Sequence, residues 1–281
     1  MTLSQHPPKP KVYVAMPCYD SVRVETCVSL LDTFSTLGRS GIEAKFKSVK
    51  SSLVTHARNL LTCGFMDSGF DYMLFVDADV EFEPEAALRM LVPEEFMVCT
   101  PYRVKEDKMK YAVKFKDPDK IKILPWDMVE IEEGPAGLML IHRIVFERMM
   151  NKYPELKIEF DENTRKKMNL EIGAKVDAID KYMYNFWDTS FSLESGEWKG
   201  EDLSFCKLAR DTGFRIYANL DSWTTHHGSR GWKGRFGDSI VKKTGNKYRI
   251  ETTSKRIETI DKKDIPKDPN NYEYYPWKEE K

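Results

Sequence analysis

At residues 72–79 the chain reads Tyr72-Met73-Leu74-Phe75-Val76-Asp77-Ala78-Asp79, an apolar run that leads directly into two carboxylates. A short continuous apolar run is typical of a strand buried on both faces, as in a parallel sheet. The two aspartates then lie at the carboxyl end of that strand. Mg²⁺ and related hard cations commonly bind through one or two carboxylates and the phosphates of a substrate. The stretch therefore predicts a place to hold a divalent cation.

The sequence contains an internal control for this spacing. Asp117-Pro118-Asp119 repeats it within the polar stretch KFKDPDKIK. Proline cannot donate to a sheet ladder, so this second copy is predicted to be a turn. The strand context, and not the spacing, distinguishes the first copy.

Strand-like and helical segments alternate around the first copy. Strands are predicted at 12–16, 42–49, 71–76 and 96–100, and helices at 22–37, 53–66 and 84–91. This order predicts the α/β class, with a mostly parallel, Rossmann-like central sheet flanked by helices. Ligands of such sheets bind beyond the carboxyl ends of the strands. The ends of the first and third strands, Pro17-Cys18-Tyr19-Asp20 and Asp77-Ala78-Asp79, are expected to border one crevice.

Composition favours an intracellular enzyme. The 281 residues are 41% hydrophobic with a formal net charge of -1, so no global charge attracts nucleic acid or a membrane. The five cysteines form no Cys-x-x-Cys pair, which argues against a zinc knuckle and against a secreted disulfide framework. No apolar run approaches a membrane span, and MTLSQHPPKPK lacks the apolar core of a signal peptide. We expect a soluble, cytoplasmic protein.

Two regions depart from the regular pattern. Residues 102–131 are charged and strand-like only in short pieces, as expected for an excursion that lines a site. Order returns at Gly134-Pro135-Ala136-Gly137, where glycines let backbone approach a ligand, although a plain tight turn explains them equally well. A strand at 138–141 and a helix to Met150 follow. Residues 151–181 are polar and irregular, which predicts a substrate-facing insertion.

A second acidic pair and a histidine pair occur later in the chain. Gly200-Glu201-Asp202 opens a predicted helix, where acidic residues serve either as an ordinary helix start or as catalytic groups. A predicted strand at 214–220 is followed by Trp223-Thr224-Thr225-His226-His227-Gly228. Because the chain has only five histidines, this pair favours a metal ligand over a structural histidine.

The order of the elements PCYD, HARN, DAD, GPAG, GED and HHG resembles that of the GT-A fold glycosyltransferases. The resemblance covers residues 11–237 and implies one GT-A domain. Its nucleotide-binding half would span about 11–100 and its acceptor-side half about 101–237. Residues 238–281 would form a basic, then charged and aromatic, extension.

On the donor side, the resemblance implies a Mn²⁺ or Mg²⁺ site. Asp79 corresponds to a direct metal ligand, and Asp77 to the residue that contacts the donor ribose and supports the metal. His226 corresponds to the late metal ligand, with His227 as the alternative. Arg58 corresponds to an arginine that reaches the nucleotide, unless it is a solvated helical charge. The other donor-binding residues that the resemblance implies are Pro17, Cys18, Tyr19, Asp20, Ala78 and Gly137.

On the acceptor side, Asp202 corresponds to the base that deprotonates the acceptor hydroxyl in inverting members, and Glu201 would support the acceptor or its loop. Sugar transfer needs a cation to stabilise the departing nucleotide diphosphate and a carboxylate to activate the attacking hydroxyl. A retaining enzyme would not need this base. We expect inversion.

The segment 228–256 holds nine Lys or Arg against two acidic residues. Its glycines and cations Arg230, Lys233 and Arg235 would suit a lid that meets the pyrophosphate, with Lys233 counted among the donor-binding residues. The alternatives are a nucleic-acid surface and a solvated charged face. Residues 261–281 are expected to be disordered or to wrap across the core.

The sequence therefore predicts a metal-dependent glycosyltransferase whose donor is a UDP-sugar in preference to a GDP-sugar. The acceptor stays open among a glycan, a protein and a modified nucleic acid. A nucleotidyltransferase is the nearest enzymatic alternative, but PCYDSVRVET lacks the Gly-rich basic loop usual after the first strand. The non-enzymatic alternative is a cation-dependent binding module.

Overall fold

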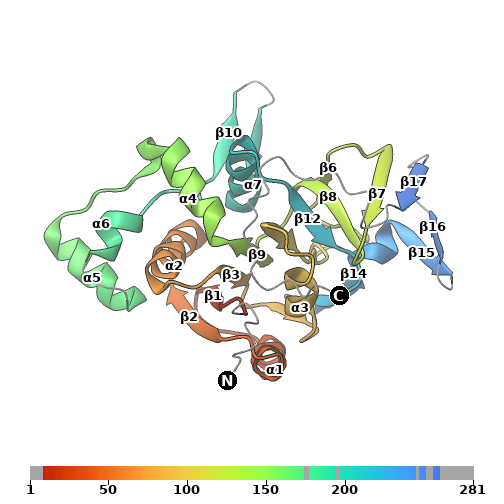
Figure 1. Ribbon diagram of the computed structural model, residues 1–281, viewed down its shortest axis with the longest axis horizontal. Coiled ribbons are helices and arrows are strands. Elements are labelled where there is room, and N and C mark those ends of the chain that lie inside the picture. The colour runs from red at the N-terminus through yellow and green to blue at the C-terminus, as the bar shows by residue number, and fades with distance from the viewer. Residues whose placement is uncertain (1–8, 174–176, 194–195, 245–246, 251–255, 260–281) are drawn as a thin grey trace, which may run out of the picture.

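The computed structural model describes residues 9–173, 177–193, 196–244, 247–250 and 256–259 (Figure 1). The strands are β1 (Val12–Cys18), β2 (Ala44–Lys50), β3 (Tyr72–Val76), β4 (Val80–Phe82), β5 (Met97–Cys99), β6 (Lys114–Phe115), β7 (Lys120–Leu124), β8 (Met128–Glu133), β9 (Leu138–His142), β10 (Ser190–Ser192), β11 (Glu197–Lys199), β12 (Ile216–Asn219), β13 (Trp223–His227), β14 (Gly231–Arg235), β15 (Val241–Thr244), β16 (Lys247–Ile250) and β17 (Arg256–Thr259). The helices are α1 (Val24–Arg39), α2 (Val54–Ser68), α3 (Ala86–Leu91), α4 (Arg143–Lys152), α5 (Glu162–Ile172), α6 (Ala178–Tyr182) and α7 (Glu201–Asp211), with 3-10 turns η1 (Pro154–Leu156) and η2 (Phe236–Ser239).

One large sheet forms the centre of the molecule. Its strand order is β17-β7-β8-β12-β5-β9-β3-β1-β2, and β6 pairs with β8. β9 lies antiparallel between β3 and β5, and β8 lies antiparallel to β12 and β7, while the other strands share one direction. The predicted α/β class with a mostly parallel, helix-flanked sheet is confirmed.

Helices cover both faces of this sheet (Figure 1). Along β3, Met73 and Phe75 belong to the cluster that includes α2, α4 and α7 residues, whereas Leu74 and Val76 belong to the cluster with α1 and α3. Burying each such side chain contributes about 1.5–3 kcal/mol. Because side chains alternate along a strand, Asp77 continues the row of Met73 and Phe75 and faces α2 and α7.

The segment 151–181 differs from its predicted irregular structure. It contains η1, α5 and α6. Asp161 caps α5, since its carboxylate accepts from the amides of Asn163 and Thr164 at 2.9 and 3.1 Å. The helix was missed because α5 is polar almost throughout, so it shows little apolar periodicity, and only Asn169 and Ile172 are buried.

The glycine-bearing segment after the histidines forms part of a sheet. β14 pairs with β13, which pairs with β4, in a separate three-stranded sheet. Farther on, β17 joins the large sheet parallel to β7. The predicted aromatic tail at 261–281 lies outside the described residues.

Three smaller expectations can be compared with the structure. Asp117-Pro118-Asp119 is a turn, as predicted, in which the Asp119 amide donates to Asp117 at 3.1 Å. All five cysteines are unpaired. No helix in the described ranges has the length and apolarity to cross a membrane.

Candidate functional site

β4 pairs with β13, and this pairing brings Asp79, which directly precedes β4, next to the histidine pair. His226 lies opposite Val80, and the His227 amide donates to the Asp79 carbonyl at 2.8 Å. His226 Nε2 is 3.5 Å from Asp79 Oδ2, and its Nδ1 is 2.9 Å from the carbonyl oxygen of Arg103. Strand alternation turns His227 to the opposite face, where Nε2 is 3.0 Å from Glu81. Of the two histidines, His226 is therefore the one beside Asp79.

Asp79 is strongly biased toward its ionised form. Burial raises the pKa of its carboxyl, but hydrogen bonds and charge from His226 and Lys105 outweigh burial and lower the pKa to about 2. The Lys105 ammonium contacts the same Oδ2 that faces His226. Asp79 thus presents a carboxylate that already attracts a cation.

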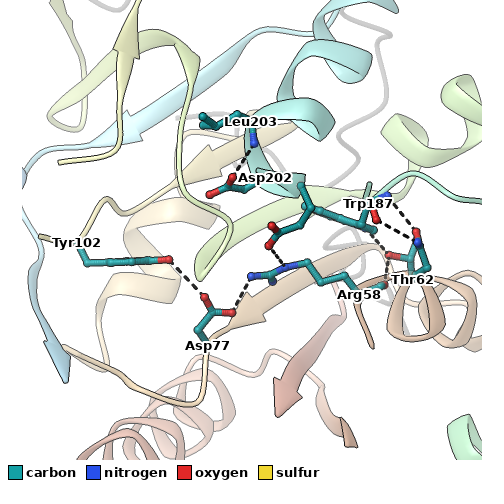
Figure 2. Close-up of polar contacts among 9 residues, drawn as sticks. Arg58, Thr62, Asp77, Tyr102, Trp187, Asp202 and Leu203 are labelled. Atoms are coloured by element: carbon teal, nitrogen blue, oxygen red, sulfur yellow. Dashed lines mark hydrogen bonds and ion pairs between the residues drawn. The ribbon is translucent and has the colours of Figure 1, made fainter. Parts of the chain in front are cut away.

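Asp77 makes contacts different from those of Asp79. Its Oδ1 accepts from Arg58 Nη2 at 2.8 Å, and its Oδ2 accepts from the Tyr102 hydroxyl at 3.4 Å (Figure 2). Arg58 Nε also donates to Glu201 Oε1 at 3.2 Å. One guanidinium therefore joins the end of β3 to the start of α7.

Gly137 lies where backbone must approach Asp77 closely. The Asp77 amide donates to the Gly137 carbonyl at 2.8 Å. A Cβ at Gly137 would lie 2.3 Å from the Tyr102 hydroxyl and 2.4 Å from Asp77 Oδ2. The close approach at Gly137 is therefore to the Asp77 and Tyr102 side chains, and approach to a ligand stays a prediction.

Gly137→Ala should therefore displace the Asp77 carboxylate and lower the free energy of unfolding by about 1–3 kcal/mol, measured by urea denaturation. Gly38→Ala is the matched control, because Gly38 is helical and a Cβ added there would meet no group outside its own helix within 4 Å. It should leave stability unchanged or raise it by up to about 1 kcal/mol. Equal stability of the two variants would contradict the close contact at Gly137.

Asp202 lies in the first turn of α7. Its Oδ1 accepts from the Leu203 amide at 2.8 Å (Figure 2). Gly200 holds the N-cap position without a side-chain cap. Burial and the neighbouring Glu201 charge raise the pKa of Asp202 to about 6, against the opposing effects of the Leu203 amide and Arg58. A carboxyl with this pKa is suited to accept a proton near neutral pH.

These groups form one electrostatic unit. The pKa of the half-buried Tyr102 is raised well above its usual value, first by desolvation and then by Asp77, Asp202 and Asp79. With Glu201, the site holds four carboxylates, and Arg58 and Lys105 are the cationic side chains in contact with them among the described residues. Four negative and two positive charges leave a formal excess of two negative charges, which favours binding of a divalent cation.

The carboxyl ends of β1 and β3 lie side by side, and the crevice between them stays a prediction. β1 and β3 pair in parallel, and the Arg23 amide donates to the Ala78 carbonyl at 2.9 Å. Pro17 is buried in β1, Cys18 is half-buried, and Tyr19 and Asp20 are exposed. The Asp20 carboxylate pairs with Lys50 at 3.1 Å. Pro17-Cys18-Tyr19-Asp20 thus borders the edge that carries Ala78.

Two cations of the predicted lid, Lys233 and Arg235, lie on the strand face opposite His226. Lys233 pairs in register with Thr225 and lines a groove of about 460 Å³ with Glu81 and Trp223. Arg235 is 3.0 Å from Asp221. Arg230 pairs with Asp107 and lies 5.1 Å from the ring of Trp232, the register partner of His226, so it is on the His226 side. Because Thr225 and His227 share a face of β13, Lys233 lies on the face opposite His226 and is not brought to Asp79.

The residues only partly match a cation centre. Within the described ranges, no group of three or more His, Cys, Asp or Glu side chains is arranged to hold a metal ion. Both oxygens of Asp77 are engaged by Arg58 and Tyr102, which leaves Asp79 and His226 as the two available ligands. Two protein ligands fit the mode in which substrate phosphates and water complete the shell of Mg²⁺.

Several residues at this site were not predicted individually. Tyr102, Arg103 and Lys105 come from the region 102–131, which the sequence predicted to line a site. Trp187 lies behind Arg58, with its ring 5.5 Å from the guanidinium carbon. The charged composition after β5 was the signal for the region, but it did not distinguish one lysine or tyrosine from another.

Comparisons with known proteins give low similarity throughout. No protein-family model and no curated protein sequence matches this chain. The structure is similar to A197 from STIV (18% identity, TM-score 0.45, covering 86% of this chain and 94% of that one). It is also similar to 4-diphosphocytidyl-2C-methyl-D-erythritol synthase from Anaerococcus prevotii (10% identity, TM-score 0.29, covering 59% of this chain and 86% of that one). A third similar structure is a glycosyltransferase involved in glycosylation of the major capsid of PBCV-1 (8% identity, TM-score 0.32, covering 75% of this chain and 93% of that one). Because these TM-scores are low, we base the function on the geometry of the site.

Proposed function

We propose that the protein is a metal-dependent glycosyltransferase that moves a sugar from a nucleoside diphosphate sugar to a hydroxyl acceptor. One observation carries the proposal. The end of β3 holds Asp79 beside His226, and Arg58 joins that same strand end to the helix start that carries Asp202. A cation-attracting pair and a carboxyl with a pKa of about 6 are thus held at one sheet edge.

Asp79 and His226 would hold Mn²⁺ or Mg²⁺ together with the donor pyrophosphate. When bound, the cation stabilises the negative charge that develops on the departing nucleotide. His226 is oriented for this task because its Nδ1 faces the Arg103 carbonyl, which leaves Nε2 directed at Asp79. Lys105 would exchange its contact with Asp79 when the cation binds.

Asp202 would act as the general base of an inverting reaction. With a pKa of about 6 it is mostly ionised at neutral pH, so it can accept the proton of the acceptor hydroxyl as that oxygen attacks the sugar carbon. Glu201 raises this pKa and is itself held by Arg58. The acid limb of the activity profile should therefore lie near pH 6, with activity lost below it.

For the donor we propose a UDP-sugar ahead of a GDP-sugar. The exposed Tyr19, at the carboxyl end of β1, offers a ring on which a nucleobase can stack.

The five unpaired cysteines fit a reducing compartment such as the cytoplasm.

A thermal-shift screen with UDP, GDP, CTP and AMP, each with Mn²⁺ or with EDTA, tests the proposal. A nucleoside diphosphate at about 100 times its Kd stabilises by about 2.7 kcal/mol, which corresponds to about 5–10 °C for a domain of this size. We expect that shift with UDP and Mn²⁺ together and its loss in EDTA. Stabilisation by CTP alone would favour a nucleotidyltransferase, and stabilisation by Mn²⁺ without any nucleotide effect would favour a binding module.

A further inference from the structure

Arg58 is the most completely enclosed charge of the candidate site. Its side chain is 3% exposed, and the guanidinium carbon lies 5.0 Å from the ring of Phe75 and 5.5 Å from that of Trp187. Burial opposes its charge, yet Asp77 and Glu201 outweigh burial and raise the pKa of Arg58. Arg58 is therefore always protonated, and its guanidinium is held in one position by the groups around it.

The support behind Arg58 comes from its own helix. Asn59 accepts from the Trp187 amide at 3.0 Å and donates to the Trp187 carbonyl at 3.2 Å. The Trp187 indole donates to the Thr62 hydroxyl at 3.0 Å (Figure 2). The Trp187 ring in turn stacks on Phe205 of α7, with centroids 3.9 Å apart and planes 9° apart. α2 and α7 are thus tied together both through Trp187 and through the Arg58–Glu201 ion pair.

We propose that Arg58 is a positioning residue that holds the donor-side carboxylate Asp77 and, through Glu201, the start of α7 that carries the base Asp202. The inference rests on the proposed function and departs from the nucleotide contact expected from the sequence. Two of the guanidinium's nitrogens are committed to Asp77 and Glu201, and Nη1 is buried without a partner among the described residues. Arg58 acts on the reaction through the carboxylates it holds, because a forked guanidinium can bridge two of them and a lysine cannot.

The charged and titratable groups around Asp202 set the readout. They are Glu201, Arg58 and Asp77, with Tyr102, Cys99 and Cys206 as neutral neighbours. Arg58 lowers the pKa of Asp202 and Glu201 raises it. Weakening the contact of Arg58 should therefore move the acid limb of the pH–activity profile to higher pH, while removing the Glu201 charge should move it to lower pH. General damage to the fold would not shift the limb in opposite directions.

The test compares Arg58→Lys, Glu201→Gln and the control Arg143→Lys. Arg143 donates to the carbonyls of Phe65, Met66 and Phe70 around the far end of α2, so its loss also disturbs a partly buried arginine. For Arg58→Lys we expect kcat to fall by about 10–100-fold, the affinity for UDP with Mn²⁺ to be kept, and the acid limb to rise. For Glu201→Gln we expect the acid limb to move to lower pH, and for Arg143→Lys we expect its pH to stay unchanged.

An unchanged limb in Arg58→Lys, together with weaker UDP binding, would overturn the inference and make Arg58 a nucleotide ligand. If the wild-type protein turns over no nucleotide sugar, the proposed function fails, but ¹³C NMR titration of Asp202 in the same variants still decides the inference. Opposite shifts of the Asp202 pKa in Arg58→Lys and Glu201→Gln would support the coupling, and identical titrations would refute it. If Arg58→Lys does not fold, Glu201→Gln, which breaks the same ion pair, takes its place: a lower kcat with unchanged UDP affinity would support the inference, and an unchanged kcat would overturn it.

Discussion

Replacing Asp79 by alanine should reduce Mn²⁺-dependent donor hydrolysis and transfer by at least about 100-fold. Asp79 is the carboxylate that faces His226 and Lys105, and its low pKa keeps it ionised throughout the physiological range. Alanine leaves His226 as the remaining available protein ligand at that point. Release of nucleoside diphosphate from a nucleotide sugar, followed by chromatography at several Mn²⁺ concentrations, measures the effect.

The second aspartate copy provides the matched control. Asp119→Ala removes a carboxylate from the exposed turn at 117–119, where the Asp119 contact seen in the structure uses its backbone amide. This variant should keep wild-type activity and wild-type Mn²⁺ dependence. Full activity in Asp79→Ala, with both variants folded, would remove Asp79 from the proposed cation site.

Asp202→Asn should lower kcat by about 100- to 10 000-fold while donor affinity stays the same. The side-chain carbonyl oxygen of asparagine can still accept from the Leu203 backbone amide, so the start of α7 is expected to keep its conformation. The asparagine side chain cannot, however, take a proton from the acceptor. Single-turnover transfer rates and calorimetric titration with UDP and Mn²⁺ separate the two quantities. The acid limb near pH 6 should disappear with the carboxyl group.

Asp211→Asn at the other end of α7 is the control for this variant. Its carboxylate pairs with Lys207 on the exposed side of the helix, 2.6 Å away. This substitution should change neither kcat nor affinity. Loss of UDP binding in Asp202→Asn would show that the residue supports the donor and would contradict its role as base.

Much of the sheet could be predicted because its strands are buried on both faces. The continuous apolar run at 72–76 identifies β3, and the alternation of strands and helices identifies the α/β class. The antiparallel insertion of β9 between β3 and β5 could not be predicted, because a continuous apolar sequence does not indicate whether a buried strand runs parallel or antiparallel to its neighbours. α5 was missed because its polar sequence conceals its helical period.

The site shows the same division. Motif order predicted which carboxylates and histidines share one edge, but it did not reveal their partners. The Arg58–Glu201 contact joins residues 143 positions apart, and nothing local to either motif indicates it. The separation of His226 from His227, and of Lys233 from Asp79, depends on which face of β13 and β14 each side chain takes, which is set by the register with β4.

The most direct test of the central claim is product analysis with the unmodified protein. Incubated with UDP- and GDP-sugars in Mn²⁺, the protein should release nucleoside diphosphate and sugar from at least one donor, and EDTA should stop the reaction. Turnover of no donor, turnover that persists in EDTA, or release of nucleoside monophosphate instead of diphosphate would contradict metal-dependent glycosyl transfer at this site.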